Sequence, residues 1–449
     1  MKSDTREEPG TPMDTRSRSA EVSSSLNAAD RKGVSADRIR EAAGVLKDKV
    51  IHTPLVHSPT FSKMTGAQVY LKLENLQKTG SFKLRGASYK VAVRAAEIGP
   101  EGLVAASAGN HAQGVALAAR RAGFPAVIVM PEWASITKQK ATEAYGGEVL
   151  LEGHSIGESI EKAQQLASQG RTFIHPFDDP DIICGQGTIG LEILQDLSDP
   201  HTIVVPVGGG GLVSGIAVAV KAQSPQTRII GVQAEACPSA FEARKTGVAR
   251  SVQARRSIAD GITVRQVGVH TLPILQDLVD DVVLVNEDEI AAALLMLLER
   301  KRILAEGAAA VSVAALLQSK LCFPPGAKIV LVISGGNVDI PLLDRIIRQG
   351  LFKNGRIMRF TIFLDDIPGT LSQLLTLVAT LKANVLHIHH DRSSGELPIH
   401  LTRVELEVET RGPEHIREIA LRLEERGYCI QSPQPFLWPE PDTASSSSA

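Results

Sequence analysis

The sequence contains only four cysteines, Cys184, Cys237, Cys322 and Cys429, among its 449 residues. They are widely separated and form no C-x-x-C pair, so we expect neither a disulfide framework nor a zinc site. The sequence also lacks a long basic run and has a formal net charge of −2, which gives no electrostatic reason to expect nucleic-acid binding. It lacks a membrane-spanning apolar run, and because its first residues carry acidic groups and no apolar stretch, we expect no signal or transit peptide there. Small-molecule chemistry in a reducing cytoplasm is therefore the expectation, with no membrane partner.

Length and composition limit the number of domains. The chain has 449 residues, of which 43 % are hydrophobic, and this is enough for two or three domains with cores of their own. Residues 1–33 are rich in Ser, Thr, Arg and Asp and poor in large apolar groups, so we expect a disordered tail there. Residues 432–449 are expected to form a second, polar tail.

From Ala36 onward, short apolar runs alternate with helical stretches. A strand that is apolar throughout is typically buried on both faces, and helices between such strands indicate parallel sheets in an α/β layout. The expected strands cover residues 102–107, 126–130, 202–207, 229–232 and 329–333. We therefore expect an α/β region over residues 34–350.

The pattern changes after Gly350, where residues 351–356 are expected to form a linker. A compact second unit is expected over residues 357–431. It would begin with a strand at 359–364, a turn and a helix with its apolar residues on one face. A pair of strands, a helix over 413–426 and a short final strand would complete a βαββαβ order.

One lysine lies between a Gly-Ser loop and an expected helix start, in the stretch Thr-Gly-Ser-Phe-Lys-Leu-Arg-Gly-Ala over residues 79–87. Catalysis by an amine needs the neutral form, so a partly desolvated lysine is the residue that forms a Schiff base with a carbonyl cofactor. For Lys83 taken alone, a solvated lysine at a helix start is the alternative.

Two further turns join an expected strand to an expected helix. Residues 207–212, Val-Gly-Gly-Gly-Gly-Leu, can direct several backbone N–H groups at a phosphate at the positive end of a helix. Residues 107–114, Ser-Ala-Gly-Asn-His-Ala-Gln-Gly, form a similar turn suited to a carboxylate. No G-x-G-x-x-G can be placed over residues 208–215, which argues against NAD.

These motifs, together with Ser-Gly-Gly-Asn-Val-Asp at residues 334–339, occur in an order that resembles the β-family (fold type II) of pyridoxal-phosphate enzymes. Within it, the chain is most similar to threonine dehydratase, also called threonine ammonia-lyase. The resemblance implies a two-domain catalytic region with parallel sheets over residues 34–350, in which a smaller subdomain at about residues 70–165 is inserted. Residues 357–431, with Asp-Ile-Pro-Gly at 366–369, resemble an α+β ACT regulatory domain.

The resemblance also implies a role for each matched residue. Lys83 would hold pyridoxal 5'-phosphate and, once released by substrate, remove the α-proton, while Ser334 would hydrogen-bond the pyridine nitrogen. Other cofactor contacts would come from Phe82, Asn110, Glu306 and the backbone of Gly208, Gly209, Gly210, Gly211 and Leu212. The substrate would be surrounded by Ser107, Ala108, Gly109, Asn110 and His111. For Glu306, a helix-start glutamate favoured by the helix dipole is the alternative, and for His111 a structural histidine.

The implied activity is conversion of L-threonine to 2-oxobutanoate and ammonia, with L-serine to pyruvate as a side activity. A serine racemase-type isomerase is the alternative, but racemases resembling this chain carry a serine where Ala108 stands, and alanine cannot transfer a proton. An ACT-based sensor on an inactive scaffold is a third interpretation, disfavoured by the intact Lys83 and Ser334. The sequence leaves open whether the role is isoleucine biosynthesis or threonine breakdown.

The resemblance further implies a homodimer or homotetramer and an amino-acid effector, isoleucine or valine, bound by Asp366, Ile367, Pro368, Gly369 and Leu371. No metal is expected. In His387-Ile388-His389-His390, the first and third residues share a strand face, so at most two ligands converge. Where serine racemase relatives carry acidic cation ligands, this chain has Gln233, Cys237 and Ser239, although Glu235 stays a candidate contact for a monovalent cation.

Overall fold

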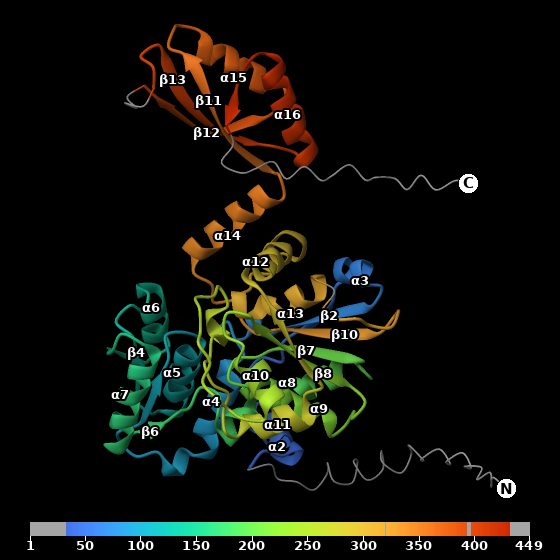
Figure 1. The fold of residues 1–449 in the computed structure, drawn as a ribbon. Helices are drawn as coiled ribbons and strands as arrows, with labels where there is room; N and C mark the ends of the chain where they lie inside the picture. Colours follow the sequence, from blue (N-terminus) through green and yellow to red (C-terminus); the bar gives the residue numbers. More distant parts are fainter. Residues whose placement is uncertain (1–32, 319, 393–396, 432–449) are drawn as a thin grey trace, which may run out of the picture. The chain divides into compact units, whose positions relative to one another are not determined.

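The structure, a computed structural model, describes residues 33–318, 320–392 and 397–431 (Figure 1). Apart from Gly33, the tails expected at 1–33 and 432–449 lie outside these described residues. The chain divides into two compact units, the first ending at Ile340 and the second beginning at Pro341. Helix α14 (Ile340–Lys353) covers this boundary, so residues 351–353 of the expected linker are helical.

The first unit contains two sheets. The larger has the strand order β1 (Leu55–His57), β2 (Gln68–Leu73), β10 (Lys328–Ile333), β7 (Thr202–Pro206), β8 (Arg228–Ala234) and β9 (Asp281–Val285). Only β1 is antiparallel to its neighbour among these strands. The smaller sheet has the order β5 (Glu148–Leu151), β4 (Ala126–Met130), β3 (Leu103–Ala106) and β6 (Thr172–Phe173), all parallel. The predicted α/β layout with parallel sheets is confirmed.

Helices separate the strands of both sheets. They are α2 (Ala36–Leu46), α3 (Pro59–Thr65), η1 (Glu74–Leu76), α4 (Lys83–Val93), η2 (Ala95–Glu97), α5 (Asn110–Ala122), α6 (Ile136–Ala144), α7 (Ile156–Ser168), α8 (Pro180–Asp196), α9 (Gly211–Lys221), α10 (Ser239–Thr246), η3 (Asp260–Ile262), α11 (Thr271–Leu278), α12 (Glu287–Met296), η4 (Leu297–Lys301) and α13 (Gly307–Leu317). Several begin at polar caps, which satisfy amides that have no partner within the helix: Asp179 accepts from Asp181 and Ile182 at the start of α8.

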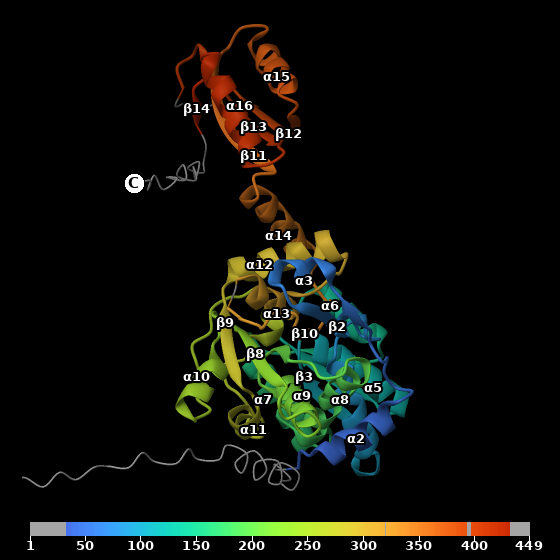
Figure 2. The ribbon, with the colours of Figure 1, turned by 90° about the vertical axis from the view of Figure 1, so that its right-hand side faces the viewer.

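The helices cover both faces of each sheet. Helices α2, α8, α9 and α11 pack together on one side of the larger sheet, and α12 and α13 lie on the other (Figure 2). In the smaller sheet, α5 packs on β3 and β4, and α7 contacts the same strands from the other side. Because β2 pairs with β10, β2 belongs to the larger sheet. The strands of the smaller sheet lie between Leu103 and Phe173, whereas the smaller subdomain was expected at about residues 70–165.

After α14, the described part of the second unit is a four-stranded antiparallel sheet with two helices. The chain order is β11 (Ile357–Asp365), α15 (Thr370–Thr380), β12 (Asn384–Asp391), β13 (Leu401–Glu409), α16 (Pro413–Glu425) and β14 (Ile430–Gln431). Phe360, Leu374, Leu406 and Leu423 from both helices and two central strands form its buried core. The βαββαβ order expected from the sequence is confirmed, and it is compatible with an ACT domain. No helix among the described residues is long and apolar enough to cross a membrane.

Candidate functional site

Lys83 is the first residue of α4, and the loop before it pairs with the loop that follows β10. The backbone N–H of Phe82 donates to the carbonyl of Ser334 over 3.1 Å, and that of Gly336 donates to Gly80 over 2.9 Å. Gly80 has φ +72°, and a side chain there would collide with the amide of Asn337. The fold therefore brings the predicted lysine motif and the predicted Ser334 motif together, although they are far apart in the chain.

The Lys83 amine is buried and contacts a backbone carbonyl. Its Nζ donates to the backbone carbonyl of Pro176 over 2.6 Å and lies 5.2 Å from the centroid of the Phe82 ring. Burial lowers the pKa of Lys83 from 10.5 to about 8, and the Glu306 carboxylate acts in the opposite direction. More of the amine is therefore neutral near pH 7 than for a solvated lysine, as nucleophilic amine chemistry requires.

Asn110, at the start of α5, lies in a side-chain network that crosses the site. Its amide nitrogen donates to both carboxylate oxygens of Glu306 over 2.9 Å. Its amide oxygen accepts from Asn337 over 2.7 Å, and Asn337 also donates to the carbonyl of Thr79. The network joins the segment before Lys83, the turn before α5 and the loop after β10. Sequence reasoning placed both Asn110 and Glu306 beside the cofactor, but it missed Asn337 as a hydrogen-bond partner of Asn110.

Glu306 precedes α13 and is only 5 % exposed. It is the N-cap residue of the helix, but its side chain makes no capping hydrogen bond, and its contact with the cofactor stays a prediction. Burial raises the pKa of Glu306 from 4.5 to about 7, against the opposing effect of the Asn110 hydrogen bond. A carboxyl group with this pKa can hold or release a proton near neutral pH.

The predicted glycine run lies between β7 and α9, and contacts leave little room for side chains. A Cβ at Gly209 would lie 2.3 Å from the Phe177 ring, and one at Gly211 would lie 2.7 Å from the Phe177 carbonyl. Gly210 has φ +97°, a conformation that favours glycine. Because α9 starts at Gly211, the amides of its first turn have no partner within the helix and can bind an anion.

Residues 107–109 join β3 to α5, which begins with Asn110 and His111, and binding of the substrate carboxylate at this turn stays a prediction. The backbone N–H of Gly109 donates to Ser107 Oγ over 3.2 Å. Ala108 is partly buried and packs against the core of the smaller sheet. His111 is buried, its Nε2 lies 2.9 Å from the Ile174 carbonyl, and burial lowers its pKa to about 3. His111 is thus a neutral histidine with a structural partner, and its contact with substrate stays a prediction.

Beside the lysine, a buried ion network fixes α4. The guanidinium of Arg85 donates to Glu74 over 2.8 Å and to Glu192 over 2.6 Å, and Arg85 and Glu74 are fully buried. Lys72, also fully buried, donates to Glu192 over 2.6 Å and to the carbonyl of Thr53. Each charge has an opposite partner, which limits the cost of burial. Arg85 lies on α4, two residues after Lys83. Through it, the network connects α4 with α8 and with the region of β1 and β2.

Lys138 of α6, beside the smaller sheet, pairs with residues of the larger domain near Glu306. Its Nζ lies 3.2 Å from a carboxylate oxygen of Asp260 and 3.5 Å from one of Asp339. The Asp260 carboxylate raises the pKa of Lys138, and burial acts against it. Sequence reasoning missed this cluster because its three members come from distant segments. Only Asp339 belongs to a motif that was recognised, the one at residues 334–339.

These residues fit pyridoxal phosphate. The glycine run offers backbone amides for a phosphate, and Lys83 offers an amine with a lowered pKa for an aldehyde. The hydroxyls of Thr79 and Ser81, in the loop before Lys83, are buried without a hydrogen-bond partner among the described residues. Such polar groups are consistent with a site built for a polar ligand.

Comparison with known proteins agrees with this geometry. A family model described as pyridoxal-phosphate dependent enzyme matches residues 46–335, so the chain belongs to this family. It is 49 % identical over 399 residues to the L-threonine ammonia-lyase of Thermotoga maritima, covering 89 % of this chain and 99 % of that protein. It is 47 % identical over 393 residues to the L-threonine ammonia-lyase of Geobacter sulfurreducens, covering 87 % and 98 %.

Solved structures give the same picture. A threonine deaminase from T.th. is 39 % identical and superposes with a TM-score of 0.64, covering 68 % of this chain and 99 % of that chain. Maize serine racemase is 34 % identical with a TM-score of 0.67, covering 72 % and 99 %. The family thus includes proteins named as lyases and as racemases, and residues of this chain must decide between them.

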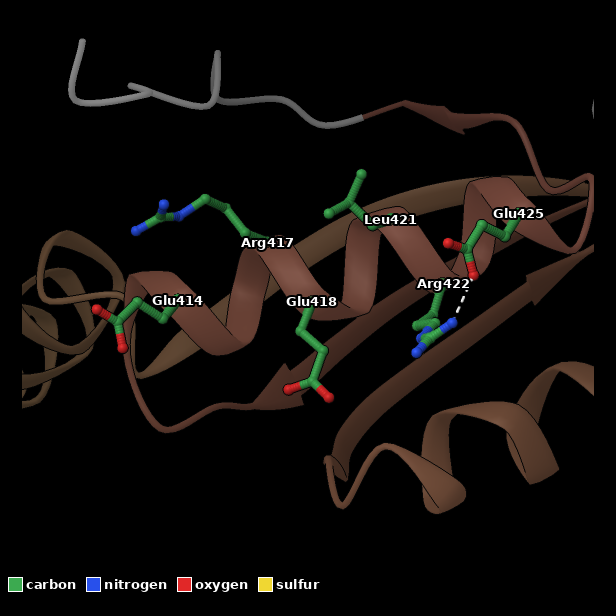
Figure 3. Close-up of a pocket in the computed structure, with 6 residues that line it drawn as sticks. All are labelled: Glu414, Arg417, Glu418, Leu421, Arg422 and Glu425. Carbon is green, nitrogen blue, oxygen red and sulfur yellow. Dashed lines mark hydrogen bonds and ion pairs between the residues drawn. The ribbon is translucent and has the colours of Figure 1, made fainter. Parts of the chain in front are cut away.

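The residues predicted to bind an effector form the turn between β11 and α15. Asp366, Ile367, Pro368 and Gly369 are exposed, and Gly369 precedes α15 with φ +102°. Asp366 accepts a hydrogen bond from Arg392 over 2.9 Å. A separate hollow in this unit is lined by α16 alone and contains the Arg422–Glu425 pair at 2.8 Å (Figure 3). Because a single helix forms it, this hollow does not enclose a ligand.

Proposed function

We propose that the chain is a pyridoxal-phosphate-dependent ammonia-lyase that converts L-threonine to 2-oxobutanoate and ammonia, with L-serine as a second substrate giving pyruvate. The observation that carries this proposal is the Lys83 amine, with its pKa lowered to about 8, in the same site as the glycine run before α9. The similarity to proteins named L-threonine ammonia-lyase over nearly the whole chain supports the substrate.

When bound, pyridoxal phosphate supplies an electron sink that makes the α-proton of an amino acid acidic. The residues of this chain supply position and proton transfer. Lys83 would take the α-proton at Nζ, since its lowered pKa keeps a useful fraction neutral. The amides of the α9 first turn would hold the phosphate, and the loop 107–111 would orient the substrate carboxylate. Ser334, only 2 % exposed and adjacent to the Lys83 loop, would face the pyridine nitrogen with a neutral hydroxyl.

A serine racemase-type isomerase is the second candidate, since maize serine racemase is among the similar structures. Racemisation needs a proton donor on the face opposite Lys83, and Ala108 has no group that can donate. We therefore expect elimination to dominate. Chiral chromatography of an L-serine incubation tests this: pyruvate should exceed D-serine by a wide margin, and D-serine formed at a comparable rate would favour the isomerase.

The second unit supports a regulatory function. Its βαββαβ order is compatible with an ACT domain, and we propose that residues 357–431 bind isoleucine or valine at the turn 366–369 with Leu371. Backbone N–H groups at the start of α15 can donate to the effector carboxylate. A homodimer or homotetramer in the cytoplasm is part of the same proposal, because pairing of regulatory domains couples effector binding to subunit packing. If neither amino acid changes the kinetics or thermal stability of the full chain, the branched-chain effector proposal is wrong.

The direct test of the activity is a steady-state assay of 2-oxo acid formation. The purified chain, supplied with pyridoxal phosphate, should release 2-oxobutanoate from L-threonine and pyruvate from L-serine, each with an equal amount of ammonia. Release from neither amino acid would contradict the proposal. Repeating the assay with L-isoleucine, L-valine and AMP tests regulation separately.

A further inference from the structure

Residues 174–178 form a crossover segment between the smaller sheet and the larger domain. They follow β6 and precede α8, whose cap is Asp179. The segment contacts the site at two points: the carbonyl of Pro176 accepts from Lys83 Nζ over 2.6 Å, and the Phe177 ring packs against Gly209 so closely that a Cβ there would lie 2.3 Å from the ring. One short segment therefore touches both the amine and the anion-binding loop.

His175 holds this segment in a tight turn. Its Nδ1 accepts hydrogen bonds from the backbone N–H of Asp178 over 2.7 Å and of Phe177 over 3.3 Å. An imidazole nitrogen can accept only when it carries no proton, so the ring must be neutral with its proton on Nε2. Burial lowers the pKa of His175 to about 4, which keeps the ring neutral near pH 7. The ring also packs edge-on against Phe177, with centroids 4.8 Å apart.

The far end of the turn is anchored to the loop before α11. The Asp178 carboxylate accepts from the backbone N–H groups of Val269 and His270, each over 2.8 Å. In the same loop, the N–H of Gly268 donates to the carbonyl of Gly209 over 3.2 Å. The turn is thus connected to the glycine run in two ways, through the Phe177 ring and through Asp178 and the loop before α11.

We propose that His175 is a positioning residue that couples the Lys83 amine to the anion-binding glycine run through this turn. The acceptor Nδ1 fixes residues 176–178, so that one carbonyl reaches Lys83 and one aromatic ring supports Gly209. The inference rests on the proposed roles of Lys83 and the glycine run, but it concerns the protein without cofactor. Its failure can therefore be distinguished from failure of the proposed lyase activity.

Two consequences follow if the acceptor is removed. The turn loses two hydrogen bonds, the Pro176 carbonyl no longer holds the Lys83 ammonium, and the pKa of Lys83 falls further below its ordinary value. The Phe177 ring also leaves the glycine run, so an anion binds more weakly. A purely structural role would lower the melting temperature without moving the pH profile of Lys83.

The test compares two variants as apo-proteins. His175→Asn keeps an acceptor oxygen near the position of Nδ1, whereas His175→Leu removes it. Calorimetric titration with inorganic phosphate should show about tenfold weaker binding for His175→Leu, the size expected for losing one or two hydrogen bonds, and nearly unchanged binding for His175→Asn. The pH dependence of Lys83 acylation, followed by peptide mass spectrometry, should shift to lower pH in His175→Leu alone.

The exposed His154 provides a matched control, and His154→Leu should behave like the unaltered chain in both measurements. Should His175→Leu fail to fold, His175→Gln takes its place, because its acceptor lies farther along the side chain and should give the same losses. Unchanged phosphate affinity and an unchanged Lys83 profile in a folded His175→Leu or His175→Gln would overturn the proposal. So would equal losses in His175→Asn, since the acceptor would then not be what matters.

Discussion

Lys83 Nζ lies 2.6 Å from the backbone carbonyl of Pro176, a residue on the segment that crosses from the smaller sheet to the larger domain. This hydrogen bond places the amine at the junction of the two sheets, close to the ring of Phe82 and within the electrostatic influence of Glu306. The amine is held by a carbonyl rather than by a carboxylate. Burial can therefore lower the pKa of Lys83, because the amine has no directly bonded carboxylate that would raise the pKa again.

The lowered pKa predicts how the apo-protein takes up its cofactor. Because only the neutral amine attacks an aldehyde, the rate of adduct formation with pyridoxal phosphate should rise with pH and level off above about pH 8, the pKa of Lys83. A lysine with the ordinary value of 10.5 would show a rate still rising at pH 9. Stopped-flow absorbance against pH measures this, and a rate still climbing through pH 10 would be inconsistent with the site described.

The ion network around Arg85 predicts a large loss of stability from a single truncation. Arg85→Ala leaves the buried Glu74 without its cation and leaves Glu192 with Lys72 alone, and breaking a buried pair costs about 3 to 5 kcal/mol. Arg40→Ala, which removes an exposed pair with Asp37, should cost less than about 1 kcal/mol. Urea unfolding of both variants checks the difference, and a similar small effect for both would show that the network contributes little.

The contact between Phe177 and the glycine run predicts a defect in anion binding. Gly209→Ala places a methyl group where only 2.3 Å separates it from the Phe177 ring, so the loop or the ring must move. Affinity for inorganic phosphate should fall by about tenfold or more. Gly44→Ala in α2, where a Cβ meets nothing within 4 Å, is the control and should bind phosphate normally. Equal affinities would mean that the run does not bind the anion.

The raised pKa of Glu306 predicts a pH-dependent gain in stability from Glu306→Gln. An acid whose pKa is raised on folding destabilises the folded state as pH rises from its unfolded value of 4.5 through the folded value of about 7. Glutamine carries no charge, so the variant should become more stable than the unaltered apo-protein by about 2 to 3 kcal/mol at pH 8 and by little at pH 5. Urea midpoints at both pH values measure this, and a difference independent of pH would refute it.

Sequence patterns predicted the framework of the fold well, for a physical reason. Buried parallel strands are apolar throughout, and the strand expected at 126–130 matches β4 at both ends. The glycine run and the Lys83 loop could be located because glycine and lysine have distinctive roles at helix starts. The assignment of residues from 70 onward to the smaller subdomain did not follow from any pattern, and β2 pairs instead with β10.

The contacts within the site were less accessible from the sequence. The bond from Asn337 to Asn110 depends on how two distant loops approach, which no local pattern encodes. Pro176 contributes only a backbone carbonyl, and every residue type has one. His175 lies in an irregular segment without helical or strand periodicity, so its two accepted hydrogen bonds become evident only from the coordinates.

The central claim is that Lys83 carries pyridoxal phosphate in a working lyase. The most direct measurement incubates the purified chain with pyridoxal phosphate, reduces it with borohydride and locates the modified lysine by peptide mass spectrometry, alongside 2-oxobutanoate release from L-threonine before reduction. We predict a single modified peptide containing Lys83, and a folded Lys83→Ala variant with neither the adduct nor the activity. An adduct on a different lysine, or undiminished 2-oxobutanoate release by Lys83→Ala, would contradict the claim.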